Sequence, residues 1–366
     1  GKSALTALTS GSGNIAIGYL AMDELTIGSS NVAIGNNALT KEVGGGSCVA
    51  IGTDVMANQD GGDSVVDMSN IGIGANAGHY NVTGTNNTWV GVDSGLGVST
   101  NSNSYNTGVG ADVMKAITTG AANVAVGYQA SDAITSGSNN VAIGKSALSA
   151  ENDGTANTAV GYQALLVQDA GSGDNYNTMV GYQAGDGIST GAQNTGIGAS
   201  VAFDVDANNQ TCVGYQATTD SANDIAIGNT SVDEVKGQVD FTTFSDKRIK
   251  KNIKDGDLGL DFIKLLKPRK FNKVNPAKYP SSIRKPNDGV DNKGNEFEWT
   301  DAQANKVWDG LIAQEVKSAI DACDTTFSGW SEESNSKQLV GYSTLVMPLI
   351  KAVQELSAEV EKLKNK

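Results

Sequence analysis

The chain has 366 residues, with 45 glycines, only 5 prolines, and 40 acidic against 26 basic side chains. Residues 1–244 hold 38 of the glycines and carry 22 acidic residues against 5 lysines and no arginine, a net charge of −17. Residues 245–366 hold all five prolines and have 21 basic against 18 acidic residues. This division excludes a single ordinary enzyme domain and predicts two regions of different architecture.

Several other classes are excluded as well. No run of 18 apolar residues is present, so no membrane insertion is expected. The acidic balance excludes a nucleic-acid partner, because an anionic surface repels phosphates. Cys48, Cys212 and Cys323 are too far apart for a disulfide framework or a zinc site, and a single His79 supports no metal cluster, so no metal or cofactor is expected. The first residues show neither an initiator Met nor a signal peptide and indicate a fragment of a longer chain.

From the N-terminus, one repeated unit fills two thirds of the chain. It reads Asn-x-Ala-[Ile/Val]-Gly, followed by a short polar step and by Ala with Leu, Met or a small residue. Seven of the twelve separations between successive repeat glycines are 17 residues, which predicts a repeat architecture. The repeat glycines are Gly18, Gly35, Gly52, Gly74, Gly91, Gly110, Gly127, Gly144, Gly161, Gly181, Gly198, Gly214 and Gly228.

The alternation within one unit predicts a strand. Val32 and Ile34 point to one face and Ala33 to the other, and Gly35 permits a sharp turn. A second short strand is expected at residues 38–39. Seventeen residues are too few for a crossover helix, so the fold class is mainly β, a β-solenoid or β-roll of stacked coils. Thirteen coils spaced by about 4.8 Å give a rod of roughly 60 Å.

So small a coil buries little apolar surface, which predicts an oligomer. Trimerisation is the natural remedy, but this argument from the residues predicts only an oligomer. Ala33, Ala125, Ala142 and Ala159 recur on the face opposite the branched aliphatics. We expect these small residues to let another chain approach closely.

The repeated asparagine predicts a stacked ladder of side-chain amides rather than a ligand site. Cys48, Gln210 and Asp224 replace it in three coils. Its members are Asn14, Asn31, Asn70, Asn87, Asn106, Asn123, Asn140, Asn157, Asn177 and Asn194.

A tyrosine directly follows the repeat glycine at four positions, Tyr128, Tyr162, Tyr182 and Tyr215. This recurrence favours a structural row of tyrosines on the rod over a sugar-binding stripe. The acidic turns at 60–63 and 169–174 match no full calcium-loop spacing and are expected to be solvated. The longer loops at 53–70, 92–106 and 162–177 are better candidates for receptor contact, since loops vary on a rigid scaffold.

The repeats NVAIGNNAL from Asn31 and NTAVGYQAL from Asn157 resemble the head repeats of trimeric autotransporter adhesins and repeats of phage tail fibres. The resemblance covers residues 1–232. It implies a trimeric left-handed β-roll and names no ligand.

Beyond a neck at 233–244, residues 245–366 have a different pattern. An apolar run at 258–266 has helical spacing, a Pro-rich and charged loop follows over 267–305, and Gly-Leu-Ile-Ala-Gln-Glu-Val spans 310–316. The last segment predicts a helix with a heptad seam and a short coiled coil. The seam residues are Val346, Leu349, Val353, Leu356, Val360 and Leu363.

Residues 245–253, Ser-Asp-Lys-Arg-Ile-Lys-Lys-Asn-Ile, together with 310–316 and the terminal helix, resemble the C-terminal intramolecular chaperone of phage endosialidases and tail fibres. The resemblance implies an α-rich domain over 245–366 that trimerises, aids folding of the upstream fibre and releases itself by autoproteolysis. It makes Ser245 the nucleophile and Lys250 the general base. Asp246, Arg248 and Asn252 match the motif without an assigned step, and Gln314 and Glu315 are expected to act inside the trimer.

The proposed dyad is chemically consistent. Residues 245–366 contain no histidine, which excludes a Ser-His-Asp triad there, and lysine is a competent base when desolvation or nearby cations lower its pKa. The alternative is that the cations around Lys250, which are Lys247, Arg248, Lys251 and Lys254, form a solvated face. The resemblance places cleavage between Ser245 and Asp246. Attack on the preceding carbonyl would instead cut between Phe244 and Ser245, and the sequence does not choose between these two bonds.

These patterns predict the distal part of a virion tail fibre for host-cell attachment, assembled in the host cytoplasm as a homotrimer. Its receptor would be a surface glycan or protein, and any peptidase activity would act on its own chain. A bacterial trimeric adhesin is the first alternative, although that class should end in a membrane-anchoring barrel. A glycan-degrading tailspike is the second, and it would need convergent carboxylates that the repeats lack.

Overall fold

The computed structural model of the chain describes residues 1–98, 101–169, 171–204, 206–232, 234–238, 243–284, 288–290, 295–333 and 336–365. It comprises two compact units, Gly1–Asn229 and Thr230–Lys366. The first unit is a β-solenoid, and the described part of the second consists of helices and antiparallel pairs of strands. Residues 233 and 239–242 of the expected neck lie outside the described residues.

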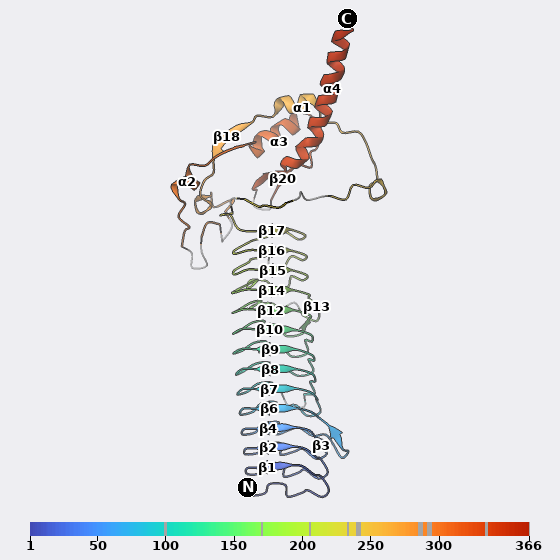
Figure 1. Ribbon diagram of the computed structural model, residues 1–366, viewed down its shortest axis with the longest axis vertical. Coiled ribbons are helices and arrows are strands. Elements are labelled where there is room, and N and C mark those ends of the chain that lie inside the picture. The colour runs from blue at the N-terminus through green and yellow to red at the C-terminus, as the bar shows by residue number, and fades with distance from the viewer. Residues whose placement is uncertain are drawn as a thin grey trace. The chain divides into compact units, whose positions relative to one another are not determined.

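Thirteen three-residue strands of the first unit form one parallel sheet, with one strand per coil stacked in chain order (Figure 1). The twelve turns between them confirm the predicted solenoid of about 17-residue repeats. The strands are β1 (Ile15–Ile17), β2 (Val32–Ile34), β4 (Val49–Ile51), β6 (Ile71–Ile73), β7 (Thr88–Val90), β8 (Thr107–Val109), β9 (Val124–Val126), β10 (Val141–Ile143), β12 (Thr158–Val160), β14 (Thr178–Val180), β15 (Thr195–Ile197), β16 (Thr211–Val213) and β17 (Ile225–Ile227).

The strands pair in strict register, so equivalent residues of successive coils form columns. Val141 lies beside Val124, and Ala142 beside Ala125. Two short additional parallel pairs form where the repeat lengthens. They are β3 (Gly45–Gly46) with β5 (Val66–Asp67), and β11 (Gly154–Thr155) with β13 (Gly173–Asp174).

The expected orientation of the strands is wrong. Ala33, Ala125, Ala142 and Ala159 are at most 1 % exposed and point into the coil, where no second chain can reach them. The residue before each repeat glycine is always Ile or Val, and it points outward. We call these thirteen residues the aliphatic column; they are Ile17, Ile34, Ile51, Ile73, Val90, Val109, Val126, Ile143, Val160, Val180, Ile197, Val213 and Ile227.

The physical reason is the narrow interior, which Trp89 illustrates. Trp89 takes the alanine position of β7, and its neighbours in the adjacent coils are both glycines, Gly72 and Gly108. A Cβ at Gly108 would lie 2.6 Å from Trp89 Cε3. The indole is therefore accommodated at this position because both adjacent coils have no side chain there.

The second half of each coil is not the short strand that we expected. In the second coil, Asn37 and Leu39 have φ values of +55° and +52°, so two residues that are not adjacent adopt the left-handed conformation. The Asn37 N–H still donates to Tyr19 O and the Leu39 N–H to Val55 O, at 2.9 and 3.1 Å. The segment is thus bonded to both neighbouring coils while Leu39 fills the core.

The glycine column marks the closest approach of one coil to the next. A Cβ at Gly144 would lie 2.3 Å from the Gly161 carbonyl oxygen, and its φ is +136°. Only glycine combines this conformation with this contact.

The predicted asparagine ladder is confirmed, and it runs mainly through the backbone. Asn140 is buried; its Oδ1 accepts the Asn157 N–H and its Nδ2 donates to Gly154 O, both at 2.9 Å. Its own N–H donates to Asn123 Oδ1 at 2.9 Å. Each amide therefore satisfies buried groups of the following coil.

Two buried Glu–Gln pairs occupy positions that hold Leu25 or Ile134 in other coils, seven residues after the glycine. Glu42 accepts N–H donors of Gly45 and Gly61 and the Gln59 Nε2, and is fully satisfied. Glu151, its counterpart, has only one well-bonded oxygen. Its Oε1 accepts the Gly154 N–H at 2.7 Å, while Oε2 has no hydrogen-bond partner in the described part of the chain.

The described part of the second unit contains four helices and two antiparallel pairs of strands. Its apolar cluster is Leu258, Phe262, Val316, Ala319 and Ile320. The elements are α1 (Leu260–Leu265), β18 (Arg269–Asn272), α2 (Asp301–Ala304), β19 (Val307–Gly310), α3 (Ala313–Ala322), β20 (Trp330–Glu332), β21 (Gln338–Val340) and α4 (Val346–Lys364), with 3₁₀ turns at Lys247–Ile249, Pro276–Lys278 and Tyr342–Leu345.

The helices at 258–266 and at the C-terminus are confirmed, but the expected loop at 267–305 is partly structured. β18 lies within it and pairs antiparallel with β19, aligning Phe271 with Trp308. All six predicted seam residues of α4 are exposed in the single chain. Among the described residues, no helix is long and apolar enough to cross a membrane.

We predict that Asn140→Ala destabilises the protein by about 2–5 kcal/mol, because it orphans the Asn157 N–H and the Gly154 carbonyl. Denaturant unfolding measures the effect through a lower midpoint at unchanged slope. Asn36→Ala is the matched control, since Asn36 is exposed; an equal loss in both variants would contradict the ladder's role.

We also predict opposite effects at the two buried glutamates. Burial raises the pKa of Glu151, so this group favours folding below its ordinary pKa of about 4.3, and that contribution is lost as pH rises through the folded pKa. Glu151→Gln should therefore raise Tm by a few degrees at pH 7 and change little at pH 4.

Glu42→Gln should lower Tm at pH 7, because an amide N–H then faces the Gln59 Nε2 donor. Thermal melts of both variants, followed by circular dichroism, measure the two changes in Tm, and a change of the same sign in both variants would contradict the prediction.

Candidate functional site

The motif at residues 245–252 folds into one tight turn. Asp246 caps the 3₁₀ helix Lys247–Ile249, and its side chain accepts the Arg248 N–H at 2.8 Å. The turn closes when the Lys250 N–H donates to Lys247 O. This geometry returns the chain so that residues five apart in the sequence face one another.

The turn brings the predicted nucleophile and base together. Lys250 Nζ donates to Ser245 Oγ at 2.7 Å. This is the distance at which a base can take the hydroxyl proton, although a donating ammonium must first lose its own proton.

Asp246 is occupied elsewhere. Arg248 Nε and Nη2 both bind its carboxylate, the latter at 2.7 Å, and this pairing lowers the pKa of Asp246 and raises the pKa of Arg248. Because Arg248 takes up the carboxylate, Lys250 is left directed at the serine. The motif residues Asp246 and Arg248 thus support the turn and do not touch the hydroxyl.

The site is open to water in the single chain. Ser245 and Lys250 are exposed, and so are Ile249, Ile253 and Phe244, the last by 96 %. The dyad therefore has its geometry but lacks the desolvation that a lysine base needs.

The other motif residues lie apart from the dyad. Asn252 has a φ of +55° and continues the turn. Gln314 and Glu315 lie on α3, where Arg269 of β18 binds Glu315 and lowers the pKa of its carboxyl. No contact among the described residues joins Gln314 or Glu315 to Ser245 or Lys250.

Ring size distinguishes the two candidate bonds. Attack by Ser245 Oγ on its own carbonyl would close a four-membered ring, whereas attack on the Phe244 carbonyl closes a five-membered one. Cleavage between Ser245 and Asp246 therefore needs a hydroxyl or water from elsewhere as the nucleophile. Cleavage after Phe244 can begin with the Ser245 hydroxyl itself and needs water only to hydrolyse the resulting ester.

An open cleft of about 1360 Å³ lies beside α4 and was not predicted from the sequence. Thr243, the loop 255–258 and the loop 326–328 line it, together with Met347 and Ile350 of α4. Met347 and Ile350 lie off the heptad seam and give the helix a second apolar side. These two residues are the feature of the sequence from which the cleft could have been predicted. Glu355 of α4 also accepts the Leu260 N–H and caps α1.

The acidic turns of the solenoid bind their own chain. Asp60 Oδ1 accepts the Gly62 N–H at 2.8 Å, and Asp174 accepts the hydroxyls of Thr155 and Tyr176. Within the described ranges, no three His, Cys, Asp or Glu side chains gather as a metal site. Comparisons with models of protein families, with curated proteins and with solved structures find no match to the chain.

Proposed function

We propose that the chain is the distal part of a virion tail fibre that attaches to host cells. Its solenoid is the fibre shaft, and residues 245–366 are a chaperone that drives trimeric folding and then releases itself by Ser/Lys autoproteolysis. The contact between Lys250 Nζ and Ser245 Oγ at 2.7 Å carries the peptidase part of this proposal, because the motif alone left a solvated cationic face as an alternative.

Two exposed apolar surfaces support the trimer. Nine residues of the aliphatic column are 36–57 % exposed, in line along the whole stack. The seam of α4 is equally open, with Val353 exposed by 63 %. Apolar surfaces of this extent mark protein interfaces. The aliphatic column and the α4 seam of one chain can each pack against the same surface of another copy.

Assembly would also supply the desolvation that the dyad lacks. Phe244, Ile249 and Ile253 are exposed apolar residues around Ser245 and Lys250. Covering them with neighbouring copies removes water from the ammonium, and Lys250 then gives up its proton more readily. Cleavage would thus follow trimerisation and leave a folded fibre behind.

The easier chemical route is an acyl shift at Phe244. Neutral Lys250 takes the Ser245 hydroxyl proton, Oγ adds to the Phe244 carbonyl, and the C–N bond breaks as the proton passes to the Ser245 amine. Water then hydrolyses the Phe244 ester, which restores the hydroxyl and gives a new carboxylate. The alternative cut, between Ser245 and Asp246, uses a water that Lys250 would activate.

The attachment role rests on the class of fold and on the longer loops at 53–70, 92–106 and 162–177, which are candidates for contact with a glycan or protein receptor. A bacterial trimeric adhesin has the same kind of solenoid, and the turn at 245–252 favours the fibre. A glycan-degrading tailspike is disfavoured, because none of the thirteen solenoid strands carries a carboxylate.

Intact-mass measurement of the purified full chain tests the peptidase. Wild type should give two fragments whose masses name the bond cut, and Ser245→Ala and Lys250→Met should each give one uncut species. Lys251→Met is the control, because Lys251 is the neighbouring cation and should leave cleavage intact. An uncut wild type would remove the autoproteolysis proposal.

Deletion of residues 245–366 tests the chaperone. Without them the solenoid chains should aggregate or stay monomeric, because the aliphatic column remains uncovered during folding. Size-exclusion chromatography with light scattering reads the outcome against full-length Ser245→Ala. A soluble trimer that resists SDS without these residues would contradict the chaperone role.

A further inference from the structure

Two lysines of the second unit converge on one indole ring. Lys273 Nζ lies 3.9 Å and Lys306 Nζ 4.2 Å from the centroid of the Trp308 ring. Lys273 directly follows β18, and Lys306 directly precedes β19. The paired strands end at Asn272 and Val307, which are partners across the sheet. The two lysines therefore extend this pair by one step and lie across from one another, on the face that carries the indole.

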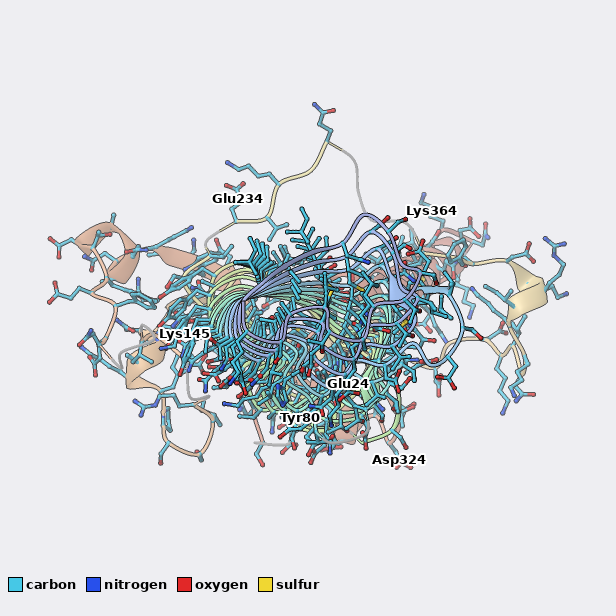
Figure 2. All side chains as sticks on the ribbon, turned by 90° about the horizontal axis from the view of Figure 1, so that it is seen from below. Glu24, Tyr80, Lys145, Glu234, Asp324 and Lys364 are labelled. Carbon is cyan, nitrogen blue, oxygen red and sulfur yellow. The ribbon has the colours of Figure 1, made fainter. Side chains whose placement is uncertain are left out.

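No other ring in the described part of the chain has two ammonium groups beside it. Lys145, which projects from the outer surface of the solenoid coils, lies 5.8 and 6.0 Å from the centroids of two different rings (Figure 2). Lys317 and Lys337 lie 5.4 and 5.8 Å from the centroids of their rings. Both lysines at Trp308 are closer than any of these. Because like charges placed opposite one another repel, the pair is destabilising unless a negative charge joins it.

The chain does not supply that negative charge. Among the described residues, neither lysine at the indole forms an ion pair, whereas Lys270, on the opposite face of β18, binds Asp309 at 3.2 Å. A hollow of about 20 Å³ adjoins the two lysines and the indole, and it has room for about one water-sized group. Its lining residues include Trp299 and Gln303 but no Asp or Glu.

Other side chains at this hollow also supply hydrogen-bond donors. Gln303 Oε1 accepts the Thr300 N–H at 3.0 Å and the Thr300 hydroxyl at 3.1 Å, in the capping box of α2. This contact occupies the acceptor of the amide and leaves its Nε2 as a donor. The indole N–H groups of Trp299 and Trp308 can only donate. The lining side chains thus offer several donors and no negative charge, which is the composition of an anion site.

We propose that Lys273, Lys306 and the hollow beside Trp308 bind an oxyanion of the phosphate class. A phosphate group carries a charge of about −1.5 to −2 at neutral pH and has three strong acceptor oxygens, so it matches two ammonium groups and the donors next to them. A carboxylate brings one charge and two oxygens and leaves part of the lysine pair uncompensated. None of these residues belongs to the solenoid or to the dyad, so the site is independent of the attachment and peptidase proposals.

Tryptophan fluorescence of full-length Ser245→Ala, titrated with inorganic phosphate at constant ionic strength, tests the site. The emission should change saturably, and Trp308→Phe should lose most of the change. Lys273→Met and Lys306→Met should each weaken phosphate binding about tenfold, because each removes one charged donor. Lys270→Met is the matched control, since this lysine has its own carboxylate partner, and it should leave the midpoint unchanged.

Two further measurements separate binding from folding. Lys273→Arg keeps the positive charge and should keep most of the binding that Lys273→Met loses. Phosphate should also raise the Tm of the Ser245→Ala protein above its value in chloride of equal ionic strength, because a ligand of the folded state stabilises it by mass action. Lys306→Met should lose this increase. Unchanged circular dichroism confirms that each variant is folded.

Phosphate midpoints that are the same with and without Lys273→Met and Lys306→Met would overturn the proposal. So would an equal loss in Lys270→Met, which would indicate general attraction to a basic surface, and so would acetate that binds as tightly as phosphate. Glucose 1-phosphate identifies the source of the group. Binding as tight as that of inorganic phosphate supports a phosphate carried by a larger molecule, and tighter binding of inorganic phosphate supports the free ion.

Discussion

The narrow interior of a 17-residue coil is the constraint on which the solenoid depends. At the strand centre it holds a methyl group, as at Ala142, and it takes an indole at Trp89 only because the coils on both sides have glycine there. Backbone groups inside so tight a coil cannot reach water, so buried asparagines bind them from coil to coil. Close stacking likewise requires the glycine column, where a Cβ would strike the next carbonyl.

The narrow interior also determines which residues stand on the outer surface of the solenoid. Branched aliphatics that do not fit at the strand centre stand outside as the aliphatic column, and exposed apolar surfaces of this kind commonly mark protein interfaces. Residues just beyond the glycines are free to vary, and there the chain places tyrosines and one lysine in line. The contact between Ser245 and Lys250 is complete in one chain, and under the proposed function its desolvation would depend on assembly.

The sequence predicted the repeat period, the strands, the amide ladder and the helices at 258–266 and 346–364, because each has a strong local signal. It did not predict which side of the strand is inside: Val32 and Ala33 are both apolar, and alternation alone cannot rank them. The left-handed conformation at Asn37 and Leu39 was also hidden, since ordinary residues adopt it only under the stacking of coils. At the candidate site, the motif predicted a pairing of Ser245 with Lys250, and the two side chains are in contact. Their exposure and the cleft beside α4 depend on contacts distant in sequence, which the motif does not report.

We propose that further copies of the chain cover the aliphatic column and the α4 seam. Native mass spectrometry of full-length Ser245→Ala, which keeps both regions in one chain, measures this most directly. A species of three chains at micromolar concentration is the predicted result. A stable, soluble monomer at that concentration would contradict the account, because it would leave both apolar surfaces in water.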